Sequence, residues 1–124
     1  MLLGVDHRTA DEYARKWIEA WNNHDAESLV AHYTEDVHFY SPFVEKLTGD
    51  PSGLLVGREN LRLYFQKGMD AYPHTRFQLH KVGVGIRSIV LNYISVENTL
   101  ASEVHVLNED GEAYEVRCHY SAAI

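Results

Sequence analysis

The spacing of hydrophobic residues changes once along this chain. In its first half, apolar residues recur every three or four positions, which is typical of helices that bury one face. From Arg76 onward they alternate with polar residues, which is typical of strands with one buried face. The pattern predicts helices first and a run of antiparallel strands afterwards, so we expect a single α+β domain.

Two helices are expected before the first strand. Thr9 and Glu12 have the spacing of a capping box, and the apolar positions that follow form one helix face up to residues 22–24. Asp25 can then cap a second, short helix, whose apolar positions continue to Tyr33.

The middle of the chain combines a strand, a loop and a third helix. Residues 37–41 alternate as a strand does, and Pro42 stops that strand. Residues 48–53 are rich in turn formers, which predicts a loop. Gly57 then opens a helix that Pro73 closes.

Four strands follow, and short turns separate them. The clearest turn is Asp110-Gly111, because an Asp-Gly pair between two alternating segments favours a two-residue type I′ hairpin. These short connections predict neighbouring antiparallel strands. The expected strands cover residues 76–84, 88–96, 99–107 and 112–121.

Glu103 and His105 are the most informative pair in the sequence. They lie two residues apart in a predicted strand, so their side chains point to the same face of the sheet. A two-residue turn after this strand places Glu103 opposite Cys118 and His105 opposite Val116. That face is the apolar one, although a bulge would exchange the two faces. Its partner strand contributes Tyr114, Val116, Cys118 and Tyr120.

Two interpretations of this pair remain open. A carboxylate beside an imidazole on an apolar face is what a proton-handling pocket requires. The same pair also fits a buried polar contact that serves structure alone. Burying a carboxylate costs several kcal/mol unless it is neutralised, hydrogen-bonded or paired. Glu103 therefore acts either as a neutral acid or as the partner of a protonated His105.

Composition and charge exclude several classes of function. The chain has 124 residues, of which 45% are hydrophobic and 23% charged, as expected of one globular domain. A net charge of −7 without a basic cluster argues against nucleic acids and anionic membranes as partners. No apolar run is long enough to cross a bilayer, and residues 1–9 lack a signal-peptide segment. Cys118 is the only cysteine, which fits a reducing, cytoplasmic location.

The histidines do not form a recognisable metal motif. None of the eight occurs in an HxH or HxxxH pattern. The nearest candidate set is Glu103, His105 and His119, which lacks the spacing of a metal site. We therefore expect no metal centre.

Three segments of the sequence resemble the SnoaL-like branch of the nuclear transport factor 2-like superfamily. They are WIEAWNNHDAESLVAHYTEDVHFYSP at 17–42, GRENLRLYFQKG at 57–68 and EVHVLNEDGEAYEVRCHYS at 103–121. The resemblance implies a cone, in which a curved antiparallel sheet wraps around N-terminal helices and a pocket opens at one end. It also implies a homodimer. The superfamily includes ketosteroid isomerases, polyketide cyclases, dehydratases, epoxide hydrolases and non-catalytic binding modules, so the fold does not define the function.

Comparison with ketosteroid isomerase assigns expected roles to individual positions. Glu103 falls where that enzyme has the carboxylic acid of its oxyanion hole, and Tyr33 falls on a tyrosine of its hydrogen-bond network. Trp17 replaces the principal oxyanion tyrosine, and its indole N–H can only donate. Ser41 replaces the aspartate base, so the resemblance leaves His105 as the best candidate base.

Two functional hypotheses follow from these observations. The first is a cofactor-free isomerase, cyclase or dehydratase in which Glu103 and His105 transfer protons on a small apolar carbonyl or hydroxyl compound. The alternative is a non-catalytic ligand-binding or dimerisation module. Several of the expected pocket residues suit a hydrophobic core equally well. They are Trp17, Tyr33, Phe39, Ser41, Phe65, Met69, Cys118 and Tyr120.

Overall fold

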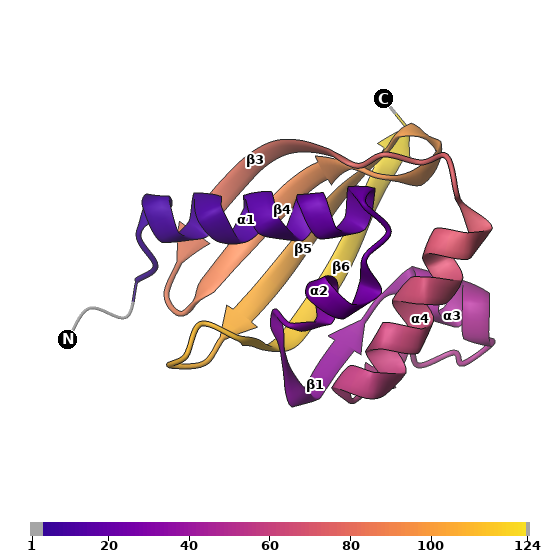
Figure 1. The fold of residues 1–124 in the computed structure, drawn as a ribbon, viewed down its shortest axis with the longest axis horizontal. Helices are drawn as coiled ribbons and strands as arrows, with labels where there is room; N and C mark the ends of the chain where they lie inside the picture. Colours follow the sequence, from indigo (N-terminus) through magenta and orange to yellow (C-terminus); the bar gives the residue numbers. More distant parts are fainter. Residues whose placement is uncertain (1–3, 124) are drawn as a thin grey trace.

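A computed structural model describes residues 4–123 of the chain. Helices and strands alternate in its first half, and strands alone follow (Figure 1). The elements are α1 (His7–Asn22), α2 (Ala26–Val30), β1 (Tyr33–Tyr40), α3 (Pro42–Thr48), β2 (Leu54–Val56), α4 (Arg58–Ala71), β3 (Gln78–Gly85), β4 (Ser88–Ile94), β5 (Thr99–Leu107) and β6 (Ala113–Ala123), with a short 3-10 turn at Val96–Asn98.

The strands form one sheet in the order β2-β1-β6-β5-β4-β3. Neighbouring strands are antiparallel except β1 and β6, which are parallel. Helix α1 lies across the face of β3, β4 and β5, α4 lies beside β1, and α2 packs against α1 and α4 (Figure 1). The α+β prediction is therefore confirmed, with the correction that one strand pair is parallel.

The start of the first helix differs from the prediction. Asp6, rather than the expected Thr9 and Glu12 box, caps α1, because its carboxylate accepts the Thr9 backbone N–H at 2.8 Å. The helix consequently begins at His7. The expectation that residues 1–9 lack a signal-peptide segment includes residues 1–3, which lie outside the described residues.

The second helix is shorter than predicted. Asp25 caps α2 as expected, with its carboxylate accepting the Ser28 backbone N–H at 3.1 Å. Tyr33, which we predicted within this helix, begins β1 instead. The chain already pairs with β6 at this point, since the Ala113 N–H donates to the His32 carbonyl at 2.8 Å. Sheet pairing therefore ends the helix.

A short helix that the sequence did not predict, α3, lies between β1 and the expected loop, which the structure has at residues 49–53. The Ser41 hydroxyl accepts the Phe43 backbone N–H at 3.1 Å and caps α3. Pro42 lies in the first turn of this helix, where a missing N–H is tolerated. The same proline that ends the strand therefore begins a helix. Gly57 precedes α4 as expected.

The β5–β6 hairpin has the predicted register over its central part. Glu103 pairs with Cys118 and His105 with Val116, so the inner face carries Glu103 and His105 as expected. Glu103 is 3% exposed and His105 is 0% exposed. Both polar side chains therefore belong to the interior, beneath α1.

The turn of this hairpin differs from the prediction. The Asn108 N–H donates to the Glu112 carbonyl at 2.8 Å, so three residues, not two, form the loop. The register shifts after Val106, and Ala113 instead of Tyr114 pairs with Leu107. Tyr114, which we placed on the inner face, is 43% exposed as a result.

Candidate functional site

A pocket opens between the C-terminal end of α1, helix α4 and the inner face of the sheet. The enclosed space is small, with about 60 Å³ accessible to the centres of water-sized molecules, and it opens to solvent at its mouth. Among residues 4–123, Glu103 is the only carboxylate on the wall, and no Lys or Arg lines it. The pocket therefore suits an uncharged, mainly apolar ligand.

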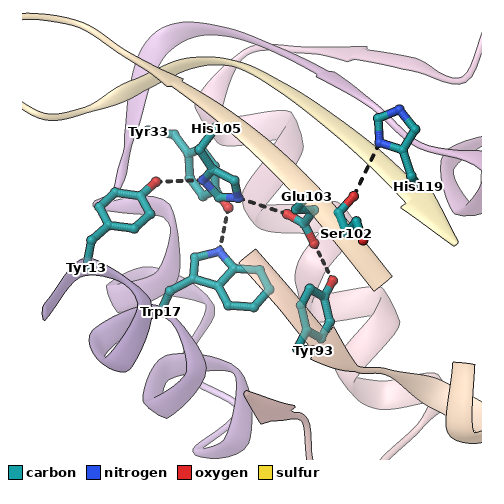
Figure 2. Close-up of polar contacts among 8 residues, drawn as sticks. All are labelled: Tyr13, Trp17, Tyr33, Tyr93, Ser102, Glu103, His105 and His119. Carbon is teal, nitrogen blue, oxygen red and sulfur yellow. Dashed lines mark hydrogen bonds and ion pairs between the residues drawn. The ribbon is translucent and has the colours of Figure 1, made fainter. Parts of the chain in front are cut away.

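Glu103 has two side-chain hydrogen-bond partners, Tyr93 and His105. The Tyr93 hydroxyl donates to Oε2, and Oε1 lies 3.0 Å from Nε2 of His105 (Figure 2). No Lys or Arg among the described residues forms an ion pair with this carboxyl. Both oxygens are thus fixed while the carboxyl faces the pocket, which is a suitable arrangement for proton exchange with a bound molecule.

His105 lies behind Glu103 and does not line the pocket. Its Nδ1 lies 2.7 Å from the Tyr13 hydroxyl, so both ring nitrogens have partners (Figure 2). The rings of Trp17 and Tyr33 pack around it, each with its centroid 5.9 Å from that of the imidazole. A ligand in the pocket therefore contacts Glu103 but not His105.

The tyrosines around Glu103 remain protonated. Burial raises the pKa of Tyr93 well above 10, and the negative charge of Glu103 raises it further. Burial and Glu103 act in the same direction on the pKa values of Tyr13 and Tyr120. These hydroxyls are therefore available as hydrogen-bond donors at neutral pH.

Cys118 has no features of a nucleophile. Burial raises the pKa of its thiol well above 9, and Glu103 opposite raises it further. The thiolate that nucleophilic chemistry needs is therefore disfavoured. Cys118 acts as a small buried side chain, as its position in the sequence suggested.

The structure divides the expected pocket residues into two groups. Phe39, Phe65, Met69 and Tyr120 line the pocket together with Glu103. The other four lie outside its wall. Ser41 caps α3, Cys118 is buried in β6, and the Trp17 indole N–H donates to the Tyr33 hydroxyl at 2.9 Å.

Several pocket residues were not predicted from the sequence. Trp21 contributes a buried indole Nε1 that, alone among the side-chain nitrogens and oxygens described as buried, has no hydrogen-bond partner. Tyr93 lies on the inner face because Leu91, two residues earlier, pairs with Glu103. Aligning the two predicted strands would have identified it. Tyr64, Phe77 and His24 also belong to this group.

No metal centre is evident among residues 4–123, where no three His, Cys, Asp or Glu side chains are placed to hold an ion. His119, the third member of the set considered from the sequence, is exposed on the outer face of the sheet. Its Nδ1 lies 3.3 Å from the Ser102 carbonyl, away from Glu103 and His105 (Figure 2). Within the same residues, no helix is long and apolar enough to span a membrane.

Solved structures with the same fold are numerous. A SnoaL-like protein of unknown function from Burkholderia thailandensis has a TM-score of 0.91 and 28% identity, and the match covers 95% of this chain and 98% of that one. A candidate ketosteroid isomerase from Kribbella flavida has a TM-score of 0.68 and 15% identity, covering 94% and 81%. SalBIII, an epoxide hydrolase/cyclase-like enzyme of pyran ring formation in salinomycin, has a TM-score of 0.72 and 17% identity, covering 94% and 93%.

Other structural neighbours are described as nuclear transport factor 2-like or cystatin-like. The search of curated proteins gives no match. The family comparison is more specific, because the model of the SnoaL-like domain matches residues 14–121, which is nearly the whole described chain. The sequence resemblance is thereby confirmed, and the chain belongs to the SnoaL-like domain family.

Proposed function

We propose that this protein binds a small, uncharged, mainly apolar molecule with a carbonyl or hydroxyl group, and that Glu103 exchanges a proton with it. The reaction would be a cofactor-free isomerisation, cyclisation or dehydration. One observation carries the proposal: a single carboxyl, fixed by two hydrogen-bond partners, faces an aromatic pocket that no Lys or Arg of the described residues lines. Carboxyl groups held in such pockets are typical acid–base catalysts.

The pocket wall supplies a further group that this chemistry requires. Tyr120 lines the pocket and remains protonated, so its hydroxyl can donate to a ligand oxygen. Donors of this kind stabilise the negative charge that develops on a carbonyl oxygen when a neighbouring carbon loses its proton.

Glu103 is assigned both proton transfers. Ser41, at the position of the ketosteroid isomerase base, caps α3 and lies outside the pocket wall. His105 is also outside it. A single carboxylate can accept a proton from one carbon and return it to another, which is the shuttle that an isomerisation needs. The fold shared with a candidate ketosteroid isomerase and with SalBIII supports small-molecule chemistry of this class.

The test uses 1-tetralone, an uncharged bicyclic aromatic ketone, in deuterated water. Proton NMR follows the loss of hydrogen next to the carbonyl. We expect the wild type to accelerate this exchange and Glu103→Gln to reduce the acceleration about 100-fold or more. Glu115→Gln, the same change on the outer face of the sheet, is the matched control and should leave the rate unchanged. Equal rates for wild type and Glu103→Gln would refute the role of Glu103.

A second function is favoured by a different observation. Both oxygens of Glu103 already have partners inside the protein, and His105 is fully enclosed. This is also the structure of a polar pair in a non-catalytic binding module. Binding of 1-tetralone, measured by tryptophan fluorescence, without any acceleration of its exchange would support the binding module and exclude the enzyme for ketones of this class.

A further inference from the structure

We propose that Tyr13 and His105 form a proton relay that connects Glu103 with the side of the molecule next to His32, away from the pocket. The relay rests on the proton exchange by Glu103 proposed above. The relay would explain why Glu103 is hydrogen-bonded to His105 and, through it, to Tyr13. A carboxyl that only binds a ligand does not need such a chain. Tyr13 and His105 are positioning and relay residues here, since neither lines the pocket.

The geometry of the chain is continuous. The Tyr13 hydroxyl lies 2.7 Å from Nδ1 of His105, and Nε2 on the other side of the ring lies 3.0 Å from Glu103 Oε1 (Figure 2). An imidazole with partners on both nitrogens can receive a proton at one and release a proton from the other. His105 thus separates the pocket carboxyl from a phenol on α1 while keeping them in hydrogen-bond contact.

The two ends of the chain have different environments. Glu103 is 3% exposed and faces the pocket, so a ligand there covers its open side. At the other end, Tyr13 and His32 are only partly buried, and their ring centroids are 4.8 Å apart. Tyr33 is the other titratable side chain packed on the imidazole. When the pocket is occupied, the partly exposed Tyr13 and His32 leave this end of the chain nearer to solvent than Glu103.

The proton passes from Glu103 to water, and His105 and Tyr13 are both neutral at the end. After Glu103 has taken a proton from the ligand, its Oε1–H donates to Nε2, and Nδ1–H donates to the Tyr13 oxygen. The Oε1–H bond breaks as Nε2–H forms, Nδ1–H breaks as a new Tyr13 O–H forms, and the original Tyr13 hydroxyl proton passes to water. Glu103 is again a carboxylate, while His105 and Tyr13 are neutral. His105 has exchanged one neutral tautomer for the other.

The first experiment needs no ligand. Protein labelled with ¹⁵N-histidine and ¹³C-glutamate reports the His105 tautomer and the protonation of Glu103 by NMR as the pH is lowered. We expect His105 to change from the Nε2–H to the Nδ1–H tautomer at the pH where the Glu103 carboxyl becomes protonated. In Tyr13→Phe, Nδ1–H has no acceptor, so the tautomer change should disappear. Tyr114→Phe, at an exposed tyrosine, should behave as wild type.

A His105 tautomer that does not respond to Glu103, or that responds equally in Tyr13→Phe, would overturn the relay.

The second experiment repeats the 1-tetralone exchange with Tyr13→Phe. We expect deuterium entry to slow about tenfold while the dissociation constant for the ketone is unchanged. Wild-type protein that shows the tautomer change but exchanges no ketone would contradict the proposed function alone. An unchanged exchange rate in Tyr13→Phe would overturn the relay while leaving the role of Glu103 intact.

Discussion

The interior of this protein has two halves that use the same residue types differently. We call Trp17, Tyr33 and His105 the sealed cluster. They are 1%, 0% and 0% exposed, and each has a hydrogen-bond partner inside the protein. The pocket wall beyond Glu103 is also aromatic, but it is open, and Trp21 on it has a buried indole N–H without a partner.

The difference shows what each half is suited to do. Polar groups that satisfy one another fix a single arrangement of the core, whereas an open wall leaves its side chains accessible to a ligand. Glu103 is the boundary between the two halves, since His105 binds it from the sealed side and the pocket lies on the other. Mutations on the two sides should therefore have different consequences.

The largest effect is expected for His105→Leu. Leucine is of similar size, but it leaves the Tyr13 hydroxyl and one oxygen of Glu103 without a partner in the interior. We expect the free energy of unfolding in urea to fall by about 3–5 kcal/mol, as when one member of a buried polar pair is removed. His119→Leu, the same change on the outer face, should alter it by less than about 0.5 kcal/mol. Similar losses for both variants would contradict the distinction between the two sides of the sheet.

A comparison of the two tryptophans gives the next largest effect. Trp17→Phe removes a hydrogen bond to Tyr33 and leaves a cavity in the sealed cluster, so we expect the free energy of unfolding to fall by about 2–4 kcal/mol. Trp21→Phe removes a donor that has no partner and lies beside existing space, so its loss should be about 1 kcal/mol. Thermal and urea denaturation of both variants measure this difference. An equal loss would mean that the pocket wall is packed as tightly as the core.

His32, at the edge of the sealed cluster, should make the free energy of unfolding depend on pH. Burial, with smaller contributions from His105 and Lys16, lowers the pKa of His32 from 6.5 to about 4. Between these values the unfolded chain binds a proton that the folded protein does not, so the free energy of unfolding falls as the pH falls from 6.5 to 4. His32 is partly exposed, and we therefore expect a loss of only about 1–2 kcal/mol.

Urea denaturation of wild type and His32→Gln at pH 7 and pH 4.5 isolates this contribution. The exposed carboxylates whose pKa values are lowered, such as Asp6 and Asp25, have ordinary values of 3.8 and are present in both proteins, so their effect cancels. Between pH 7 and pH 4.5, the free energy of unfolding should fall more for wild type than for His32→Gln. A difference that is the same at both pH values would show that His32 titrates alike in the folded and unfolded chains.

The sequence was sufficient to predict what depends on local pattern. The bounds of β5 and the inward direction of Glu103 and His105 follow from alternation and from the register of one hairpin, and the structure confirms them. In contrast, α3 and β2 are short elements whose formation depends on a cap by Ser41 and on pairing with β1. Interactions of this kind carry little periodic signal.

The division between sealed cluster and pocket wall had no local signal. Trp17 and Trp21 are one helical turn apart on the same face of α1, so their spacing alone does not distinguish them. The family resemblance favoured Trp17 as the pocket residue, and the structure corrects this, because Trp21 lines the pocket and Trp17 does not. The structure places Trp17 beside Tyr33 and His105, and Trp21 beside Phe65 and Phe77 at the cavity. Which tryptophan is sealed depends on the strands that pack opposite α1, and this is a property of the tertiary structure alone.

The smallest effect, and one of opposite sign, is expected on the pocket wall. Gly68 lies within α4 and lines the pocket, and an added Cβ would meet only Trp21 at 3.8 Å, an ordinary contact. Gly68→Ala should therefore raise the free energy of unfolding by about 0.5–1 kcal/mol through helix propensity while it narrows the cavity and weakens 1-tetralone binding. Gly57→Ala is the matched control, because Gly57 has φ 97° and alanine there should destabilise the protein. A stabilised Gly68→Ala that binds the ketone less tightly would mean that the helix accepts a weaker residue there because the pocket needs the space.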